Sequence, residues 1–198
     1  MENIVKMDVN GPKEDIGAIV ALHRHSFTNV LIGQMGEDYL QFYYKNIINN
    51  PAGVIYIYKM DSEVAGFLAG ISTGRGFYTI KYYQKTILAL LKSIIQRPSI
   101  LVNLVIYIYR NIIIHGKEPD AELLSIAVDK QYQGRGIGTL LVKNYETWLM
   151  QNNTCKYKVY TDTNYSTGNA LYEKLGFQLS GQAKLFGIEY KMYRRDIL

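Results

Sequence analysis

The sequence predicts one α/β domain over residues 1–198, in which a mixed, centrally splayed sheet is flanked by helices. Its composition is typical of a globular domain with a sizeable core, because 48% of the residues are apolar and only 20% are charged. Segments with the two-residue period of strands alternate along the chain with segments of helical period. Near residue 130, an apolar run, a glycine-rich loop and a helical segment follow one another, as in α/β proteins.

The N-terminal part of the chain predicts three strands and two helices. Pro51-Ala52-Gly53 breaks the second helix, and the polar segment Met60–Glu63 between two apolar runs indicates a β-hairpin. The predicted elements are a strand at 4–9, helices at 13–27 and 36–50, and strands at 54–59 and 64–71.

Residues 77–115 predict a helical insertion. Two apolar helices, Ile80–Ile95 and Ser99–Ile114, are separated by a break at Arg97-Pro98. Residues 74–117 carry seven Lys or Arg and no Asp or Glu, whereas the whole chain has a net charge of only +5. This asymmetry indicates an anionic partner such as the phosphates of a cofactor, a nucleotide-sugar or a phospholipid surface, or else a solvated basic face.

The insertion connects the hairpin directly to the strand at 121–128, so both of its ends are expected near a reaction centre. Its second helix is interrupted by Asn103 and Arg110 and falls short of the roughly 20 apolar residues that span a bilayer. We expect the insertion to cover the acceptor side of that centre and to contribute to a homodimer contact. Binding to a membrane surface is the alternative.

The C-terminal part of the chain predicts a strand at 121–128, a helix at 137–152, a strand at 157–162, a helix at 167–175 and strands at 177–182 and 185–194. One face of the helix at 137–152 is apolar and is expected to be buried. That face comprises Ile137, Leu140, Leu141, Tyr145, Trp148 and Leu149.

The loop between the strand at 121–128 and the helix at 137–152 has the composition of a phosphate-binding turn. Glycines let the main chain approach a ligand, and a helix N-terminus offers free N–H groups to an anion. The G-x-x-x-x-G-K-[ST] motif of nucleotide triphosphatases is absent, and Thr139 stands where a dinucleotide fingerprint needs its third glycine. The pattern that fits is Q-x-x-G-x-G, formed by Gln133, Gly136 and Gly138.

A second segment, ALYEKLGF at 170–177, follows the strand-like KVYTD at 158–162. Together the two segments resemble the GCN5-related N-acetyltransferase (GNAT) family, whose members transfer an acyl group from acyl-CoA to an amine. The resemblance implies acetyl-CoA as co-substrate and the mixed, splayed sheet of the family. It assigns the binding of coenzyme A to Ile126, Ala127, Val128, Gln133, Gly134, Arg135, Gly136, Ile137, Gly138 and Thr139.

Further segments resemble acetyltransferases found with bacterial surface-polysaccharide genes. They are LHRHSF at 22–27, FYYKNII at 42–48, VAGFLAG at 64–70 and ELLSIAV at 122–128. This finer resemblance implies a small-molecule acceptor, an amino sugar or a nucleotide-linked amino sugar, and no nucleic acid. A protein N-terminus or lysine is the alternative acceptor, and a catalytically silent CoA-binding module is the alternative function.

Transfer to an amine requires a base that removes a proton and an acid that protonates the leaving thiolate. For the base we name Glu122, which would share a strand face with Leu124, Ile126 and Val128 and precedes Gln133 by the eleven residues seen in histone-acetylating members. A water chain is the alternative base. For the acid we name Tyr172, at the tyrosine position of the second motif. The resemblance implies the backbone N–H of Val128 as oxyanion donor.

Two pairs of polar residues complete the predicted site. The resemblance implies that an asparagine about seven residues before the tyrosine contacts coenzyme A. No asparagine stands at that spacing, so Asn164 is expected to fill the role and Asn169 is the alternative. His25 and Ser26 would border the acceptor pocket, since the family builds it partly from the first helices.

The remaining sequence features argue against other chemistry. Three histidines without a ligand spacing predict no metal site. A single cysteine, Cys155, predicts no internal disulfide and is expected to be half-buried beside a strand. The N-terminus lacks the pattern of a signal peptide, so we expect a cytoplasmic protein.

Overall fold

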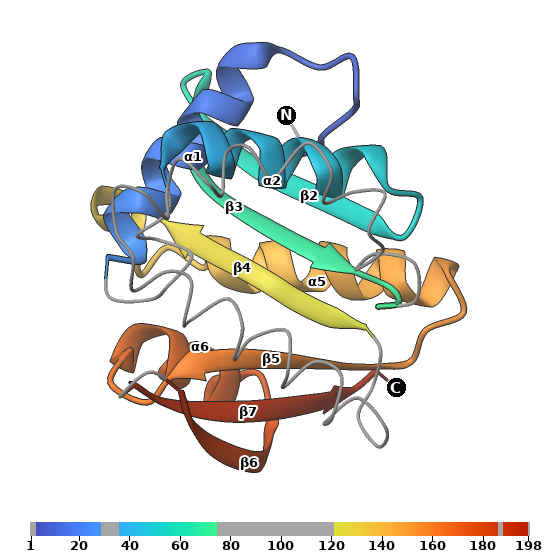
Figure 1. Ribbon diagram of the computed structural model, residues 1–198, viewed down its shortest axis with the longest axis vertical. Helices are drawn as coiled ribbons and strands as arrows, with labels where there is room; N and C mark the ends of the chain where they lie inside the picture. The colour runs from blue at the N-terminus through green and yellow to red at the C-terminus, as the bar shows by residue number, and fades with distance from the viewer. Residues whose placement is uncertain (1–2, 29–35, 75–120, 186–187, 198) are drawn as a thin grey trace.

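The computed structural model describes residues 3–28, 36–74, 121–185 and 188–197. The predicted insertion at 77–115, with its two helices, lies outside the described residues. The description below therefore concerns the sheet, the four helices around it and the loops that connect them (Figure 1).

Seven strands form one mixed sheet in the order β1-β2-β3-β4-β5-β7-β6. All neighbouring strands pair antiparallel except β4 and β5, which are parallel. The strands are β1 (Ile4–Lys6), β2 (Gly53–Met60), β3 (Glu63–Ile71), β4 (Glu122–Val128), β5 (Lys156–Asp162), β6 (Gln178–Leu185) and β7 (Ile188–Asp196).

Helices cover both faces of the sheet and enclose two hydrophobic cores. α1 (Lys13–Ser26) and α2 (Glu37–Asn49) pack on one face of β2, β3 and β4, and we call their core the α1–α2 core. α5 (Ile137–Gln151) and α6 (Ser166–Lys174) pack on the other face, and we call theirs the α5–α6 core. Figure 1 shows α2 in front of the sheet and α5 behind it.

β4 and β5 separate soon after they begin, so the sheet is splayed at its centre. Their register contains only the pairs Glu122–Lys158 and Leu123–Val159, preceded by a hydrogen bond from the Lys158 amide to the Ala121 carbonyl at 3.1 Å. Beyond these pairs the two strands diverge toward the left of Figure 1. The predicted centrally splayed sheet is confirmed.

A β-bulge interrupts β4 near its middle. Ala69 of β3 pairs with Ser125, whereas the next residue, Gly70, pairs with Leu123. Leu124 is therefore an extra residue of β4, and it packs toward the α1–α2 core. Bulges bend a strand and change which face its side chains reach.

Tyr145 of α5 fixes the start of β4. Its hydroxyl donates to the carbonyls of Ile71 and Glu122 at 2.8 and 2.9 Å, so one phenol connects the end of β3 with the beginning of β4. The ring lies where a side chain on Gly70 would be, because a Cβ there would come within 2.4 Å of the ring. Glycine at this position lets α5 approach the sheet closely.

The predicted strands and helices within the described residues are confirmed, with ends shifted by at most a few residues. Two side chains differ from the prediction. Leu140 is 43% exposed, because the buried side of α5 is instead extended by Val142 and Glu146. Cys155 is exposed rather than half-buried, because it precedes β5 at the surface. None of the described helices is long and apolar enough to cross a membrane.

Candidate functional site

The predicted phosphate-binding turn joins β4 to α5. Gly134 and Gly136 have φ angles of +77° and +81°, a region that favours glycine, and a Cβ on either would meet no atom within 4 Å. Gly136 caps α5, and its carbonyl accepts the first helical hydrogen bond, from Leu140 at 3.1 Å. The amides of Ile137, Gly138 and Thr139 precede that bond and are the free donors of a helix N-terminus.

Side chains within the turn hold it against the end of β4. The Gln133 amide donates to the Val128 carbonyl at 2.9 Å, and the Asp129 carboxylate accepts from the Gln131 backbone at 3.0 Å. The Arg135 guanidinium lies 5.5 Å from the centre of the Tyr132 ring on the exposed side of the turn. The turn is therefore shaped by its own contacts, and its glycine backbone is left open.

The edge of β4 that faces β5 carries the main-chain groups of Ile126 and Val128. The Asp129 amide donates to Ala65 of β3 at 2.9 Å, and successive amides of a strand point to opposite edges. Val128 and Ile126 therefore face away from β3, beyond the last pairs that β4 makes with β5. Ala127 faces β3 instead, so the structure does not bring its main chain to this edge.

Glu122 lies on the opposite face of the sheet from Ile126 and Val128, so the predicted shared face is wrong. Leu123 and Ile126 belong to the α5–α6 core, and Val128 packs against it. Because neighbouring residues of a strand alternate between faces, Glu122 points to the other side. The bulge at Leu124 causes the difference, since it shifts the alternation by one residue.

Lys158 shares the face of Glu122. The two are register partners on parallel strands, and the neighbours of Lys158, Tyr157 and Val159, belong to the α5–α6 core on the other side. The Lys158 side chain is only 1% exposed, and its ammonium lies 5.7 Å from the centre of the Tyr160 ring. Acidic and basic side chains thus flank the point where β4 and β5 separate.

Tyr172 lies in α6 and is 4% exposed. Its ring contacts Phe177 and Tyr193, with centroid distances of 5.2 and 5.7 Å. Burial raises the pKa of its phenol well above the ordinary value, and the nearby phenols of Tyr165 and Tyr193 raise it further. Tyr172 therefore holds its proton at any physiological pH.

The two candidate asparagines have different surroundings. Asn169 is 6% exposed, and its amide donates to the carbonyls of Asp162 and Thr163, both at 3.1 Å. Its side-chain oxygen is buried and has no hydrogen-bond partner among the described residues. Asn164 is exposed, and its backbone amide donates to the Asp162 carboxylate at 2.8 Å. Asn169 thus joins the end of β5 to α6 and retains a free acceptor.

The end of α1 presents a second histidine, His23, that the sequence analysis did not select. His25 is exposed and bonds the Ala21 carbonyl at 2.8 Å, and Ser26 is the last residue of α1. His23, by contrast, is fully buried and hydrogen-bonded to the Tyr44 hydroxyl at 2.5 Å. Its position in the apolar stripe of α1, three residues after Val20, is the signal that could have found it.

α1 also reaches the start of α6. Phe27, which follows α1, contacts Tyr165, the residue that caps α6, with ring centroids 6.3 Å apart. A side chain on Gly168 would come within 2.5 Å of the Tyr165 ring, so the ring lies directly on the first turn of α6. The two helical layers therefore meet beside the diverging ends of β4 and β5.

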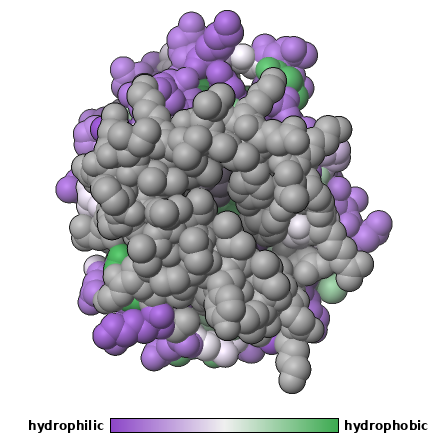
Figure 2. All heavy atoms as spheres, in the orientation of Figure 1, coloured by the Kyte–Doolittle hydropathy of each residue, from purple (hydrophilic) through white to green (hydrophobic). Residues whose placement is uncertain are grey.

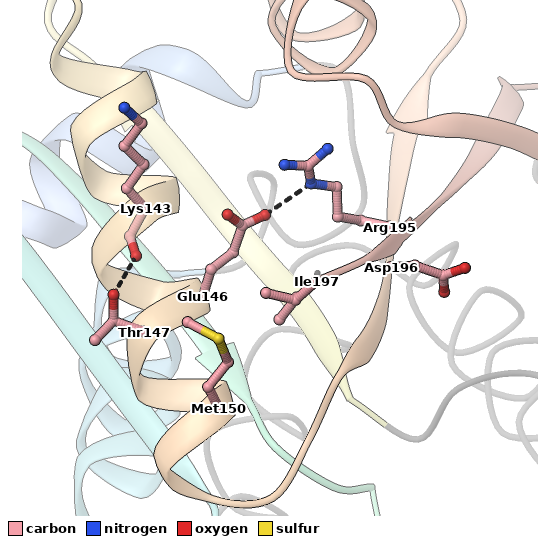
Figure 3. A pocket seen from close by; sticks show the side chains of 7 residues that line it. All are labelled: Lys143, Glu146, Thr147, Met150, Arg195, Asp196 and Ile197. Atoms are coloured by element: carbon pink, nitrogen blue, oxygen red, sulfur yellow. Dashed lines mark hydrogen bonds and ion pairs between the residues drawn. The ribbon is translucent and has the colours of Figure 1, made fainter.

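A surface pocket of about 350 Å³ lies elsewhere, between α5 and the end of β7. Figure 3 shows its centre, where Arg195 donates to Glu146 at 2.9 Å. Tyr157 also donates to Glu146, at 2.8 Å, so these groups satisfy one another in a structural network. This pocket is separate from the glycine turn at the other end of α5. In the described ranges, no group of three or more His, Cys, Asp or Glu is arranged to hold a metal ion.

Comparison with known proteins gives a family match. The model of the acetyltransferase (GNAT) family matches residues 18–177. A curated relative, mycothiol acetyltransferase of Kocuria rhizophila, is 37% identical over 57 residues. That stretch covers 29% of this chain and 19% of the relative, so the match spans about a fifth of the relative's length.

Solved structures share the fold. The PaiA N-acetyltransferase of Thermoplasma acidophilum in complex with coenzyme A is 15% identical, with a TM-score of 0.60 over 98% of each chain. An N-acetyltransferase of Staphylococcus aureus Mu50 is also 15% identical, with a TM-score of 0.62 over 98% of each chain. At these identities the likeness concerns the arrangement of helices and strands.

Proposed function

The chain belongs to the acetyltransferase (GNAT) family, and on this premise we propose that it transfers an acetyl group from acetyl-CoA directly to a primary amine. The observation that carries the proposal is the position of the glycine turn beside the open edge of β4. Gly136 and the first amides of α5 offer donors for a diphosphate, and Ile126 and Val128 offer a strand edge without a β5 partner a few residues away.

In this proposal acetyl-CoA extends from the turn along β4. Its diphosphate accepts hydrogen bonds from the amides at the start of α5, where the helix dipole also favours negative charge. Its pantetheine amides pair with Ile126 and Val128 as a short added strand would. The thioester then lies between β4 and β5, and the backbone N–H of Val128 is the proposed donor to its carbonyl oxygen.

The reaction is one displacement in a ternary complex. The neutral amine nitrogen forms a bond to the thioester carbon, whose oxygen becomes an oxyanion. The carbon–sulfur bond then breaks, the thiolate of coenzyme A leaves with the electron pair, and the amine nitrogen gives up its proton. The products are an N-acetylated amine and the free thiol of coenzyme A, and no metal is required.

Tyr172 is the proposed acid for the departing thiolate. Its raised pKa keeps the phenol protonated, and burial also raises the pKa of a thiolate in the same place. Burial thus raises the pKa of the donor and the pKa of the acceptor together, so the difference between the two pKa values stays small. Such a donor contributes roughly 10²–10⁴-fold to a rate.

Glu122 is the proposed base for the amine, and a water chain is the alternative. Because Glu122 and the α5–α6 core lie on opposite faces of β4, the amine would approach from the face of α1 and α2. His25 and Ser26 at the end of α1 are the proposed border of the acceptor pocket on this face.

The proposed acceptor is an amino sugar or a nucleotide-linked amino sugar. Thiol release from acetyl-CoA, measured with a panel of free amino sugars, nucleotide-linked amino sugars, peptides with free N-termini and lysine peptides, tests this assignment. Turnover with the sugars alone supports it, whereas faster turnover with peptides assigns a protein acceptor. Binding of acetyl-CoA without turnover of any amine would assign a silent CoA-binding module.

A further inference from the structure

Three buried polar residues from three different elements meet at the bulge of β4. His23 of α1 is hydrogen-bonded through its Nδ1 atom to the Tyr44 hydroxyl of α2 at 2.5 Å. The side chain of Ser125 in β4 faces the same hydroxyl, and its hydrogen-bonding acts to lower the pKa of Tyr44. His23 and Tyr44 are fully buried, and Ser125 is 6% exposed. We call this group the His23–Tyr44–Ser125 chain.

An apolar environment surrounds this chain. Tyr44 packs edge-on against Phe67 with a centroid distance of 5.5 Å, and His23 lies 4.6 Å from Phe27. Aliphatic side chains would fill such a core without desolvating any polar group. The polar groups therefore add little to stability beyond what apolar packing alone would provide. The His23 Nε2 atom is buried without a partner among the described residues, which adds a further unfavourable term.

The His23–Tyr44–Ser125 chain is not suited to removing a proton from substrate. Burial lowers the pKa of His23 to about 4, so the imidazole is neutral at physiological pH and a weak base. Burial also raises the pKa of Tyr44 well above its ordinary value, against a smaller lowering effect of Ser125. Both rings are therefore fixed, neutral hydrogen-bonding groups, which is the property that positioning requires.

One end of the His23–Tyr44–Ser125 chain lies where positioning matters for the proposed reaction. Ser125 follows the extra residue Leu124 and precedes Ile126, whose main chain faces the open edge of β4. The extra residue of a bulge is left unpaired and the ladder is disrupted there, so a side-chain contact of its neighbour Ser125 constrains a part of β4 that the ladder holds less well. At the other end, His23 contacts Phe27, which contacts Tyr165 at the start of α6.

We propose that His23 and Tyr44 are positioning residues, which act through Ser125 to hold the β4 bulge so that the amides of Ile126 and Val128 face the thioester. This inference rests on the proposed acetyl transfer. It assigns a role in the reaction to two side chains of α1 and α2 that lie on the opposite side of the sheet from α5 and α6.

The test compares two tyrosines that each lose only a buried hydroxyl. Tyr44→Phe breaks the chain, whereas Tyr157→Phe removes a hydroxyl bonded to Glu146 in the other core and serves as the control. We expect Tyr44→Phe to lower kcat by about 10- to 100-fold, because small misplacements of reacting groups have effects of that size. The KM for acetyl-CoA should change by less than about twofold, because the diphosphate contacts at the turn are retained. Tyr157→Phe should leave kcat unchanged.

Hydrogen exchange of the 122–128 backbone, measured by mass spectrometry, gives a readout that does not need turnover. We expect faster exchange in Tyr44→Phe and no change in Tyr157→Phe. Unchanged exchange in Tyr44→Phe, or faster exchange with a wild-type kcat, would overturn the inference. A wild-type protein that neither binds acetyl-CoA nor releases its thiol would instead contradict the proposed function, while the exchange comparison would still decide whether the chain holds the bulge.

Discussion

Leu123 of β4 and Val159 of β5 are the last paired residues between the two parallel strands at the centre of the sheet. Their side chains both lie in the α5–α6 core, and the register between the two strands ends at this pair. Beyond this pair, the edge of β4 continues to the glycine turn without a β5 partner. The proposed binding of acetyl-CoA depends on that open edge.

Replacing Gly136 tests the phosphate-binding turn. Gly136→Val places a β-branched side chain at a φ of +81° and in open space where a diphosphate would lie. We expect the Kd for acetyl-CoA, measured by calorimetry, to rise at least about tenfold, with a loss of roughly 1–3 kcal/mol in the free energy of unfolding. Gly17→Ala is the control, because a Cβ at Gly17 also meets no atom within 4 Å but lies in α1. Unchanged affinity in a folded Gly136→Val protein would mean that the turn does not hold the diphosphate.

Tyr172→Phe tests the proposed acid. The substitution keeps the ring contacts with Phe177 and Tyr193 and removes only the hydroxyl. We expect kcat to fall by about 10²–10⁴-fold and the Kd for acetyl-CoA to stay within about twofold. Tyr193→Phe, which removes a hydroxyl bonded to Glu173, is the control and should retain kcat. If single-turnover rates of Tyr172→Phe equal those of the wild type, Tyr172 has only a packing role.

Glu122→Gln distinguishes a carboxylate base from a water chain. The amide keeps the size of the side chain and cannot accept a proton. With Glu122 as base, kcat/KM should fall by about 10²–10⁴-fold. With a water chain as base, kcat/KM should stay close to the wild-type value. Glu173→Gln, at an exposed position of α6, is the control.

His23 predicts how stability depends on pH. Its pKa is about 4 in the folded protein and about 6.5 in the unfolded chain, so the unfolded chain binds the proton first as pH falls. The stabilisation is present above about pH 6.5 and is lost as pH falls toward 4, by about 1.4 kcal/mol per pH unit. Urea unfolding between pH 4 and 7 should show this slope in the wild type and a smaller slope in His23→Gln. An identical slope in His23→Gln would contradict the assignment, and His25→Gln, at an exposed position, should behave as the wild type.

The sequence predicted the elements that carry strong local signals. Gly134 and Gly136 were identified because a glycine-rich loop lies between an apolar run and a helical segment, and the structure gives both glycines positive φ angles. The apolar period of α5 predicted its bounds almost to the residue. The bulge at Leu124 left no such signal, because the mostly apolar segment 122–128 does not show by itself how its residues pair with β3. The predicted face of Glu122 was wrong for that reason.

Long-range contacts explain what else was missed. His23 and Tyr44 stand 21 residues apart on different helices, and only the packing of α1 against α2 brings them together. Figure 2 shows hydrophilic side chains (purple) along the upper rim of the molecule. The divergence of β4 and β5 was expected from the family resemblance, since it depends on how two strands pair and not on either strand alone.

A structure determined with acetyl-CoA is the most direct test of the proposed site. The account predicts the diphosphate at the amides of residues 136–139 and the pantetheine hydrogen-bonded to the main chain of Ile126 and Val128. It also predicts the thioester sulfur within hydrogen-bonding distance of the Tyr172 hydroxyl. Acetyl-CoA bound at another surface, such as the pocket between α5 and β7, with β4 and the glycine turn unoccupied, would contradict it.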